Sequence, residues 1–200
     1  MFSGIIEATG KVVSLKRTGK GGVLTLENSA LAKKAKPGDS VAVNGVCLTV
    51  TGKTGRRLQF DISAETWECT NLSSYKKDDS VNLESSVTPQ SMLSGHFVQG
   101  HVEGLGRVQK WIRNGEDVRL FVELPADLMQ YCVPKGSITL NGVSLTIASQ
   151  KGRSICVALI PYTLSHTNLN DLKPGNPVNV ETDIIGRYVV STLKKTYDNL

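Results

Sequence analysis

The chain has 200 residues, of which 40% are hydrophobic and 20% charged, which suffices for one large core or two smaller ones and excludes a disordered chain. Its net charge is only +5, and the basic residues are scattered in pairs with no aromatic stripe between them, which argues against a nucleic-acid interface. No segment approaches the ~20 apolar residues of a membrane helix, and the N-terminus lacks the basic region of a signal peptide. We therefore expect a cytoplasmic protein with neither nucleic acid nor a membrane as partner.

Short strands separated by turns are expected through the first half of the chain. Nineteen glycines against 6% aromatic residues indicate many turns. Residues 41–50 place two apolar runs on either side of Asn44-Gly45, a pair typical of a β-hairpin turn. Further strands are expected at 4–15, 22–27, 57–63 and 80–84. Residues 85–95 are polar and contain proline and glycine, which is typical of a linker.

The second half of the chain repeats the first at an offset of 96 or 97 residues. In four matched blocks 15 of 23 positions are identical, whereas chance would match roughly one position in fifteen. Order and spacing are also kept, so the chain is a tandem duplication of two similar domains. The blocks are Gly4–Val12 with Gly100–Val108, Asn44–Val50 with Asn141–Ile147, Thr70–Leu72 with Thr167–Leu169, and Val81–Glu84 with Val178–Glu181.

Each copy is expected to close into a small barrel, because closure removes the exposed edges of an open sheet. We place the first domain at 1–95, with 85–95 as its linker, the second at 96–184, and a C-terminal helix at 185–200. Proline and an acid in the first turn predict a further short helix from Pro125. The apolar face of the tail helix would dock on its own barrel or on a second chain, and the pattern favours neither. That face consists of Ile185, Tyr188, Val189, Leu193, Tyr197 and Leu200.

Two small polar side chains alternate with the apolar residues of each Asn-Gly block. Cys47 and Thr49 share one face of their strand, as Ser144 and Thr146 do in the second copy. Such a pair suits hydrogen bonding to a ligand. Turn geometry and core packing explain the rest of the block without any function, so both interpretations stay open.

Neither the histidines nor the cysteines indicate a metal site. The three histidines, at positions 96, 101 and 166, do not have the spacing of zinc ligands, so we expect no metal. No phosphate-binding loop or dinucleotide fingerprint is present, so no nucleotide cofactor is expected. The four cysteines should be free thiols, with Cys69, Cys132 and Cys156 as small core residues.

Several short motifs from both copies occur together and in order along the chain. They are Met1–Glu7, Asn44–Val50, Gly95–Val102, Lys135-Gly136, Asn141–Thr146, Ile160–Thr163 and Val178–Glu181. Jointly they resemble the riboflavin synthase family, of the alpha-chain type, over essentially all 200 residues. The resemblance implies an all-β fold of two tandem six-stranded Greek-key barrels, with a C-terminal helix that assembles a homotrimer.

The resemblance also implies a reaction. Two molecules of 6,7-dimethyl-8-ribityllumazine would give riboflavin and 5-amino-6-(D-ribitylamino)uracil, the last step of riboflavin biosynthesis, by a four-carbon transfer that needs no cofactor. A non-catalytic lumazine- or flavin-binding antenna protein is the alternative. Association with lumazine synthase, which makes the substrate, stays open.

Finally, the resemblance implies two pockets, and in the family the two that react together come from adjacent subunits. The expected catalytic residues are His101 as acid or base, Cys47 as nucleophile or polarising thiol, Ser144 and Thr146 as hydrogen-bond donors, and Asp183 as an acid that orients or accepts a proton. Substrate contacts expected in the first copy are Gly4, Ile5, Ile6, Cys47, Leu48, Thr49, Asp61, Ile62, Ser63, Ala64, Glu65 and Thr66. Those expected in the second copy are Gly100, His101, Val102, Lys135, Ser144, Leu145, Thr146, Ala158, Leu159, Ile160, Pro161, Tyr162 and Thr163.

Overall fold

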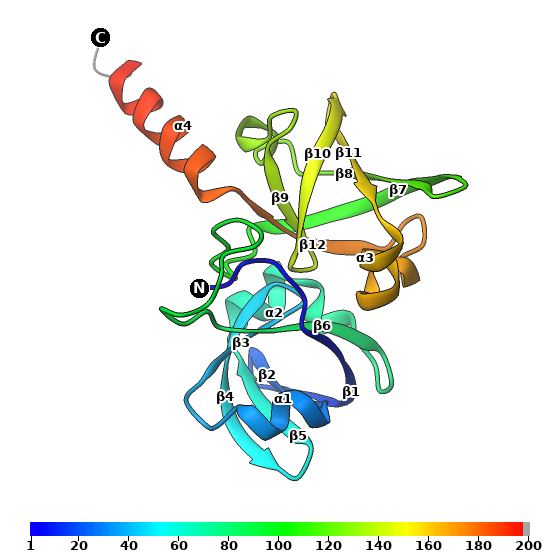
Figure 1. Cartoon of the computed structure of the whole chain (residues 1–200). Helices are drawn as coiled ribbons and strands as arrows, with labels where there is room; N and C mark the ends of the chain where they lie inside the picture. Colours follow the sequence, from blue (N-terminus) through cyan, green and yellow to red (C-terminus); the bar gives the residue numbers. More distant parts are fainter. Residues whose placement is uncertain (198–200) are drawn as a thin grey trace.

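The first half of the chain forms a closed antiparallel barrel (Figure 1). The computed structural model describes residues 1–197. The strands of this barrel are β1 (Ala8–Thr18), β2 (Gly21–Glu27), β3 (Ser40–Val43), β4 (Val46–Thr54), β5 (Arg57–Ile62) and β6 (Ser80–Ser85). They lie in the order β1-β2-β5-β4-β3-β6, and β1 closes the ring by pairing with both β2 and β6. Because β2 pairs with β5 rather than β3, the connection is a Greek key.

The second half repeats this arrangement. Its strands are β7 (Gly104–Asn114), β8 (Asp117–Glu123), β9 (Ser137–Leu140), β10 (Val143–Lys151), β11 (Ser154–Leu159) and β12 (Pro177–Thr182). Here β7 pairs with both β8 and β12, so this barrel is closed in the same order. The all-β fold of two tandem six-stranded barrels is therefore confirmed.

Alternating side chains fill each barrel. Along β5, Leu58, Phe60 and Ile62 are buried while the residues between them are exposed, as expected for a strand with one face on a core. Each barrel has its own cluster of buried aliphatic residues. The expected first strand begins at Ala8 rather than at residue 4, because residues 4–7 leave the barrel and follow a different path.

The Asn-Gly pairs form the hairpin turns that the sequence predicts. Asn44 and Gly45 have positive φ angles of 46° and 79°, and Asn141 and Gly142 have φ of 48° and 79°, as a two-residue β-turn of this kind requires. The two turns also pack closely against each other. They are so close that a Cβ added to Gly45 would lie only 2.7 Å from the Gly142 nitrogen. The turns therefore join the barrels as well as closing the hairpins.

An amide network surrounds this contact. Asn71 donates its backbone N–H to Asn179 Oδ1 at 2.8 Å, and Asn168, its counterpart in the second copy, donates to Asn82 Oδ1 at 2.7 Å. Asn179 Nδ2 in turn donates to the Asn44 carbonyl at 2.9 Å. These buried side chains cross from one barrel to the other and fix their relative orientation.

The described chain also contains four α-helices, α1 (Ser29–Lys34), α2 (Ala64–Cys69), α3 (Pro161–His166) and α4 (Ile184–Tyr197), and three 3₁₀ helices at Asn71–Ser74, Met129–Tyr131 and Asn168–Asp171. The predicted tail helix is confirmed, and it projects away from both barrels (Figure 1). On its predicted apolar face, Ile185 and Tyr188 are exposed by 58% and 70%, and Val189 and Leu193 are exposed as well; the side chain of Tyr197 and all of Leu200 lie outside the described part of the structure. No helix within residues 1–197 is long and apolar enough to span a bilayer.

Two local expectations are wrong. Residues from Pro125 form only a turn followed by a 3₁₀ helix at Met129–Tyr131, since Leu128 and Cys132 both enter the second core and turn the chain back. Cys69 is exposed rather than buried, because it ends helix α2, which has no buried residue. Cys132 and Cys156 are buried as expected.

Candidate functional site

The segments that precede the first strand of each barrel cross over to the other barrel. The Gly4 carbonyl accepts the N–H of Ser144, on β10 of the second barrel, at 2.8 Å. The Gly100 carbonyl accepts the N–H of Cys47, on β4 of the first barrel, at the same distance. Each half of the duplicated chain therefore supplies part of the wall of the barrel formed by the other half.

Both crossings require glycine. Gly4 and Gly100 each have φ of +77°, a conformation that residues with a side chain rarely adopt. A Cβ on Gly4 would lie 2.6 Å from the Cβ of Ser144, and one on Gly100 would lie 2.7 Å from the Cβ of Cys47. The backbone can approach each strand this closely only because no side chain intervenes.

This crossing corrects the expected grouping of the two pockets. The sequence predicts Gly4–Ile6 beside Cys47, and Gly100–Val102 beside Ser144. The structure exchanges them, and Val102 packs against the first core while Ile6 packs against the second. The physical reason is that the repeat aligns each segment with its own copy in sequence, whereas the segment crosses the interface before its first strand begins.

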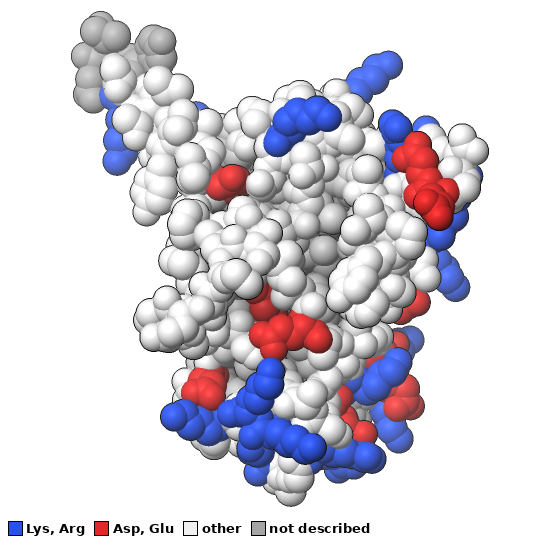
Figure 2. All heavy atoms as spheres, in the orientation of Figure 1, with Lys and Arg blue, Asp and Glu red and all other residues white. Residues whose placement is uncertain are grey.

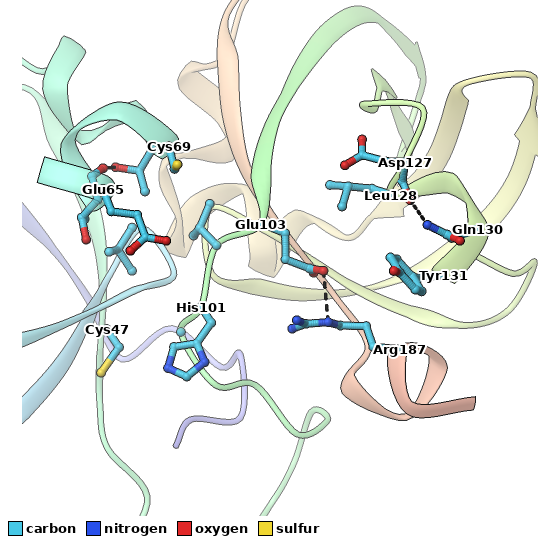
Figure 3. Close-up of a pocket in the computed structure, with 15 residues that line it drawn as sticks. Cys47, Glu65, Cys69, His101, Glu103, Asp127, Leu128, Gln130, Tyr131 and Arg187 are labelled. Carbon is cyan, nitrogen blue, oxygen red and sulfur yellow. Dashed lines mark hydrogen bonds and ion pairs between the residues drawn. The ribbon is translucent and has the colours of Figure 1, made fainter. Parts of the chain in front are cut away.

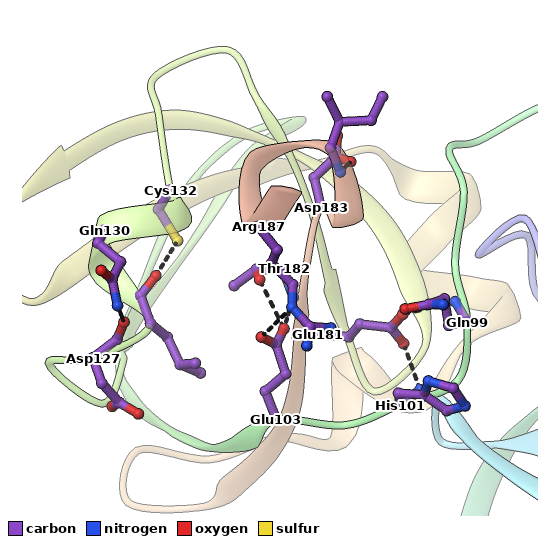
Figure 4. A network of polar contacts seen from close by, with 12 residues as sticks. Gln99, His101, Glu103, Asp127, Gln130, Cys132, Glu181, Thr182, Asp183 and Arg187 are labelled. Carbon is purple, nitrogen blue, oxygen red and sulfur yellow. Dashed lines mark hydrogen bonds and ion pairs between the residues drawn. The ribbon is translucent and has the colours of Figure 1, made fainter. Parts of the chain in front are cut away.

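A buried glutamate holds each crossing segment. Glu84 accepts the Ser3 N–H at 2.7 Å and the Gly4 N–H at 3.0 Å. Glu181 accepts the N–H groups of Gln99, Gly100 and His101 at 2.7, 2.9 and 3.1 Å (Figure 4). Burial raises the pKa of Glu84, and it raises the pKa of Glu181 to about 7 although the three N–H groups favour the carboxylate.

A cavity of about 530 Å³ opens between the first barrel, the second barrel and α4 (Figure 3). Its size suits a small organic ligand. The wall from the first barrel carries Cys47 on β4 and Glu65 and Thr66 on α2, and the crossing segment adds His101 (Figure 3). The opposite wall comes from the connection between β8 and β9 and from α4, and it consists of Asp127, Leu128, Gln130, Tyr131 and Arg187.

Six of the expected substrate contacts line this cavity together. They are Cys47, Glu65, Thr66, Gly100, His101 and Val102. Gly4, Ile5 and Ile6 cross to the second barrel, and the other expected first-copy residues lie elsewhere on the first barrel: Leu48 and Ile62 have core side chains, Thr49 and Asp61 are exposed, and Ala64 is half-buried. Ser63 is exposed and caps α2, accepting the Thr66 N–H at 3.1 Å.

Ser144 occupies the position of Cys47 on the second barrel, but its surroundings differ. Cys47 packs against an apolar cluster that includes Phe2 and Val98. Ser144 Oγ instead lies 2.8 Å from Nδ1 of His96, and Thr146 is exposed on the same face of β10. His96 is not among the expected site residues; the signal that points to it is its place in the motif Gly95–Val102.

The remaining expected second-copy residues lie just before β9, on β11 or in and next to α3, or they have core side chains. Leu145 and Leu159 are core residues, and Lys135 is exposed with φ of 68°. Tyr162, on α3, is 68% exposed and stacks on His166 with ring centroids 3.9 Å apart. Along 158–163, Ala158, Ile160 and Pro161 are exposed and Thr163 is half-buried.

Asp183 lies at the start of α4, where its Oδ1 accepts the Ile185 N–H at 3.0 Å and so caps the helix. Its charge also acts on His96, opposing the burial that lowers the pKa of that imidazole. Two further charged residues that sequence reasoning missed are Glu103 and Arg187, an ion pair at the edge of the cavity (Figure 4). The duplicated block Gly100–Val108 contains Glu103, but nothing in the pattern indicates its partner.

Chemically, the arrangement presents two related faces with different polar groups. The first combines a thiol with an exposed imidazole, and the second combines a hydroxyl with a half-buried imidazole. Within residues 1–197, no group of three or more histidine, cysteine, aspartate or glutamate side chains is placed to hold a metal ion. The thiol, the hydroxyl and the two imidazoles are groups that can hydrogen-bond to a small organic ligand and exchange protons with it.

The model of one domain family matches the chain twice. It is the lumazine binding domain, and it covers residues 3–86 and 99–183. Curated relatives include a riboflavin synthase of Bacillus amyloliquefaciens, 39% identical over 98% of this chain and 91% of that protein. A riboflavin synthase of Bacillus subtilis is 38% identical over 100% of this chain and 93% of that protein.

Solved structures agree with these matches. LumP complexed with riboflavin superposes with a TM-score of 0.84 and 27% identity, over 91% of this chain and 99% of LumP. LumP complexed with 6,7-dimethyl-8-(1'-D-ribityl) lumazine gives a TM-score of 0.83 at 24% identity over the same shares. Both similarities extend through the two barrels.

Proposed function

This chain belongs to the riboflavin synthase family of paired lumazine-binding domains, and on that premise we propose that it makes riboflavin. Two molecules of 6,7-dimethyl-8-ribityllumazine give riboflavin and 5-amino-6-(D-ribitylamino)uracil, the last step of riboflavin biosynthesis. The enzyme is a transferase, because four carbons pass from one substrate molecule to the other. The two products together account for every atom of the two substrates, so the balance needs no other reagent.

The observation that carries this function is the pair of equivalent faces, each completed by a glycine segment from the other copy. A reaction that consumes two molecules of one compound needs two similar sites in fixed relation. Holding the two rings in contact makes the bimolecular reaction effectively unimolecular. This effect can lower the activation barrier by roughly 7–11 kcal/mol at most. The differences between Cys47 and Ser144 then allow the two bound molecules to react differently.

We assign the first site to the cavity of about 530 Å³. Thr66 and Glu65 offer partners to ribityl hydroxyls, and Cys47 and His101 face the ring. His101 is the acid–base candidate, because an imidazole ring can both take up and give a proton and its side chain is exposed to the cavity. The 7-methyl group of the substrate is acidic, since its carbanion delocalises into the ring, so one proton must be taken from it.

We assign the second site to the face of β10 that carries Ser144 and Thr146, with Ile5 and Ile6 beside it and with Lys135 and the segment 158–163 at its rim. This face is open, so the first site of a neighbouring subunit can cover it. Homotrimer formation through α4 would bring the two together. The support is an apolar helix face with Tyr188, Val189 and Leu193 at least half exposed, in a region with few charged side chains (Figure 2).

Assembly and location have their own tests. Tyr188→Asp should weaken a trimer, and analytical ultracentrifugation would show lighter species. We also place the enzyme in the cytoplasm, where its four free cysteines stay reduced. Association with lumazine synthase, which supplies the substrate, would appear as co-elution of the two purified enzymes.

The activity itself is tested by incubating the purified chain with 6,7-dimethyl-8-ribityllumazine alone. Riboflavin should appear, by its absorbance and fluorescence, at half the amount of substrate consumed. Binding with shifted fluorescence and no riboflavin would overturn the synthase and leave an antenna or carrier protein. Neither binding nor product would return the chain to a binding module for another ligand.

A further inference from the structure

His96 lies over Ser144 in a tightly built corner. Its Nδ1 is 2.8 Å from Ser144 Oγ, and its backbone N–H donates to the Ser3 carbonyl at 3.1 Å. Gly95 is pressed against the same two residues, since a Cβ there would lie 2.0 Å from the Ser3 carbonyl oxygen and 3.0 Å from Ser144 Oγ. The His96 imidazole is therefore held next to the Ser144 hydroxyl.

The tautomer of His96 follows from its surroundings. Burial lowers the pKa of the imidazole, opposed by the charge of Asp183, so the ring is neutral near pH 7 and carries one proton. Its Nε2 is buried and has no hydrogen-bond partner within residues 1–197. A buried N–H without an acceptor is the rarer and costlier defect, so the proton belongs on Nδ1, where Ser144 Oγ accepts it.

From this geometry we infer that His96 is a positioning residue: its Nδ1–H donates to Ser144 Oγ and thereby turns the serine's own proton toward the ligand on the second barrel. A serine hydroxyl has one proton and two lone pairs, so occupying a lone pair from one side leaves the O–H to point elsewhere. Donation into the hydroxyl also polarises it and strengthens the bond that it gives. The inference rests on the proposed function only for the identity of that ligand.

The first barrel has no equivalent. Cys47 lies against Phe2, Ala42 and Val98, and a thiol is a weak donor. A directed O–H at Ser144 would therefore stabilise negative charge on the ring bound at the second barrel and not on the ring bound at the first. This gives the duplicated sites a physical reason to take different parts in one reaction.

The direct test needs no activity. Nitrogen NMR of the full-length protein labelled at histidine should show His96 with a protonated Nδ1 and a bare Nε2, and Ser144→Ala should shift the Nδ1 signal. A proton found on Nε2, or no response to Ser144→Ala, would overturn the inference. Because this readout does not involve product, it stands even if the wild-type chain makes no riboflavin, which would overturn the proposed function instead.

The kinetic test uses two amide variants. His96→Asn places an amide near the position of Nδ1 and should keep kcat within about fivefold, whereas His96→Gln reaches toward Nε2 and should lower kcat by about 10²-fold, the usual cost of losing a donor aimed at developing charge. KM should change little in both. In a Ser144→Ala background His96→Gln should cause no further loss; an additive loss, or equal damage by Asn and Gln, would show that His96 acts by another route or only supports the fold.

Discussion

Arg187 lies near the start of α4, and Glu103 lies just before β7. Nε of Arg187 is 3.2 Å from Oε1 of Glu103. The other oxygen of Glu103 accepts the N–H and the hydroxyl of Thr182 at 2.6 and 2.7 Å, so the carboxylate is fully engaged. Glu7, the counterpart of Glu103 in the first copy, accepts the N–H and the hydroxyl of Ser85, one on each oxygen. Its cation is the exposed Lys34 at the end of α1, 3.8 Å away, rather than a residue of α4. The second copy has thus used a duplicated carboxylate to tie the tail helix to the wall of the cavity.

Arg187→Gln should therefore disturb both the assembly and the site. Glu103 is buried enough, at 13% side-chain exposure, that losing its cation leaves a poorly compensated charge. We expect α4 to be held less firmly, self-association to weaken, and kcat/KM for riboflavin formation to fall by about tenfold, equivalent to ~1.4 kcal/mol. Steady-state kinetics and sedimentation would measure the two effects.

The matched control is Arg119→Gln. Arg119 pairs with Asp117 at 3.1 Å, but both side chains are about half exposed on the β7–β8 hairpin, where an ion pair contributes little. This variant should leave activity and assembly unchanged. If Arg187→Gln behaves like it, the ion pair has no part in positioning α4.

Gly45→Ala should destabilise the whole molecule more than an ordinary turn substitution. A Cβ at Gly45 would meet the nitrogen and Cα of Gly142 at 2.7 and 2.8 Å, and backbone atoms cannot move aside without parting the barrels. Gly55 also has a positive φ, but a Cβ there meets nothing within 4 Å. We expect Gly55→Ala to lower the free energy of unfolding by about 1–2 kcal/mol through backbone strain and Gly45→Ala to lower it by at least ~3 kcal/mol. Urea unfolding would measure both values. Equal losses would mean that the contact between the two turns does not contribute to stability.

The same Asn-Gly block shows how far the sequence leads. Alternation and the Asn44-Gly45 pair sufficed to predict the hairpin, and the repeat sufficed to predict a second barrel like the first. The contact between Gly45 and Gly142 could not be predicted, because either glycine is already explained by its own turn. Because its own turn already accounts for each glycine, the sequence gives no sign that the glycine also makes a tertiary contact.

Several of the expected residues line one cavity, but their grouping could not be predicted. Cys47 and Ser144 stood out because small polar residues alternated with a core pattern. Which glycine segment completes which face depends on the path of residues 4–7 and 100–103 across the interface, and periodicity contains no information on that path. His96 lies outside every repeated block, so comparing the two copies could not single it out.

Glu181 should make stability depend on pH. Its pKa is raised from 4.5 to about 7, so between these values the folded protein keeps a proton that the unfolded chain has released. Stability from this group is therefore highest below pH 4.5 and falls as the pH rises to 7, by about 3 kcal/mol at most. Glu84 acts in the same direction.

Unfolding free energies measured from pH 4.5 to 7 would check this. Glu181→Gln should be less stable overall, because an amide NH₂ cannot accept the N–H groups that the carboxylate holds, yet its curve should be flatter than the wild-type curve. Glu84→Gln is the matched variant, and it should flatten the curve as well. Curves for wild type and Glu181→Gln that run parallel would contradict a proton on this group.

Tyr75→Phe tests the one place where the amide network departs from its twofold pattern. In the second barrel Asn141 Nδ2 donates to Asn168 Oδ1 at 3.4 Å, whereas in the first Asn44 Nδ2 donates to the hydroxyl of Tyr75, which leaves Asn71 Oδ1 buried and without a partner within residues 1–197. Position 172, the counterpart of Tyr75, is a leucine, so the exception exists only in the first copy.

Removing the hydroxyl should allow the Asn44 amide to turn to Asn71 Oδ1 and restore the pattern of the second copy. Tyr75→Phe should then cost less than ~1 kcal/mol of stability, below the usual penalty for leaving a buried donor unpaired. Asn71→Ala should cost more, because it also removes the Nδ2 bond to Asn141 Oδ1 at 3.0 Å. Urea unfolding would measure the stability of both variants. If Tyr75→Phe loses more than ~1 kcal/mol of unfolding free energy, the Asn44 amide cannot turn and needs the Tyr75 hydroxyl as its hydrogen-bond partner.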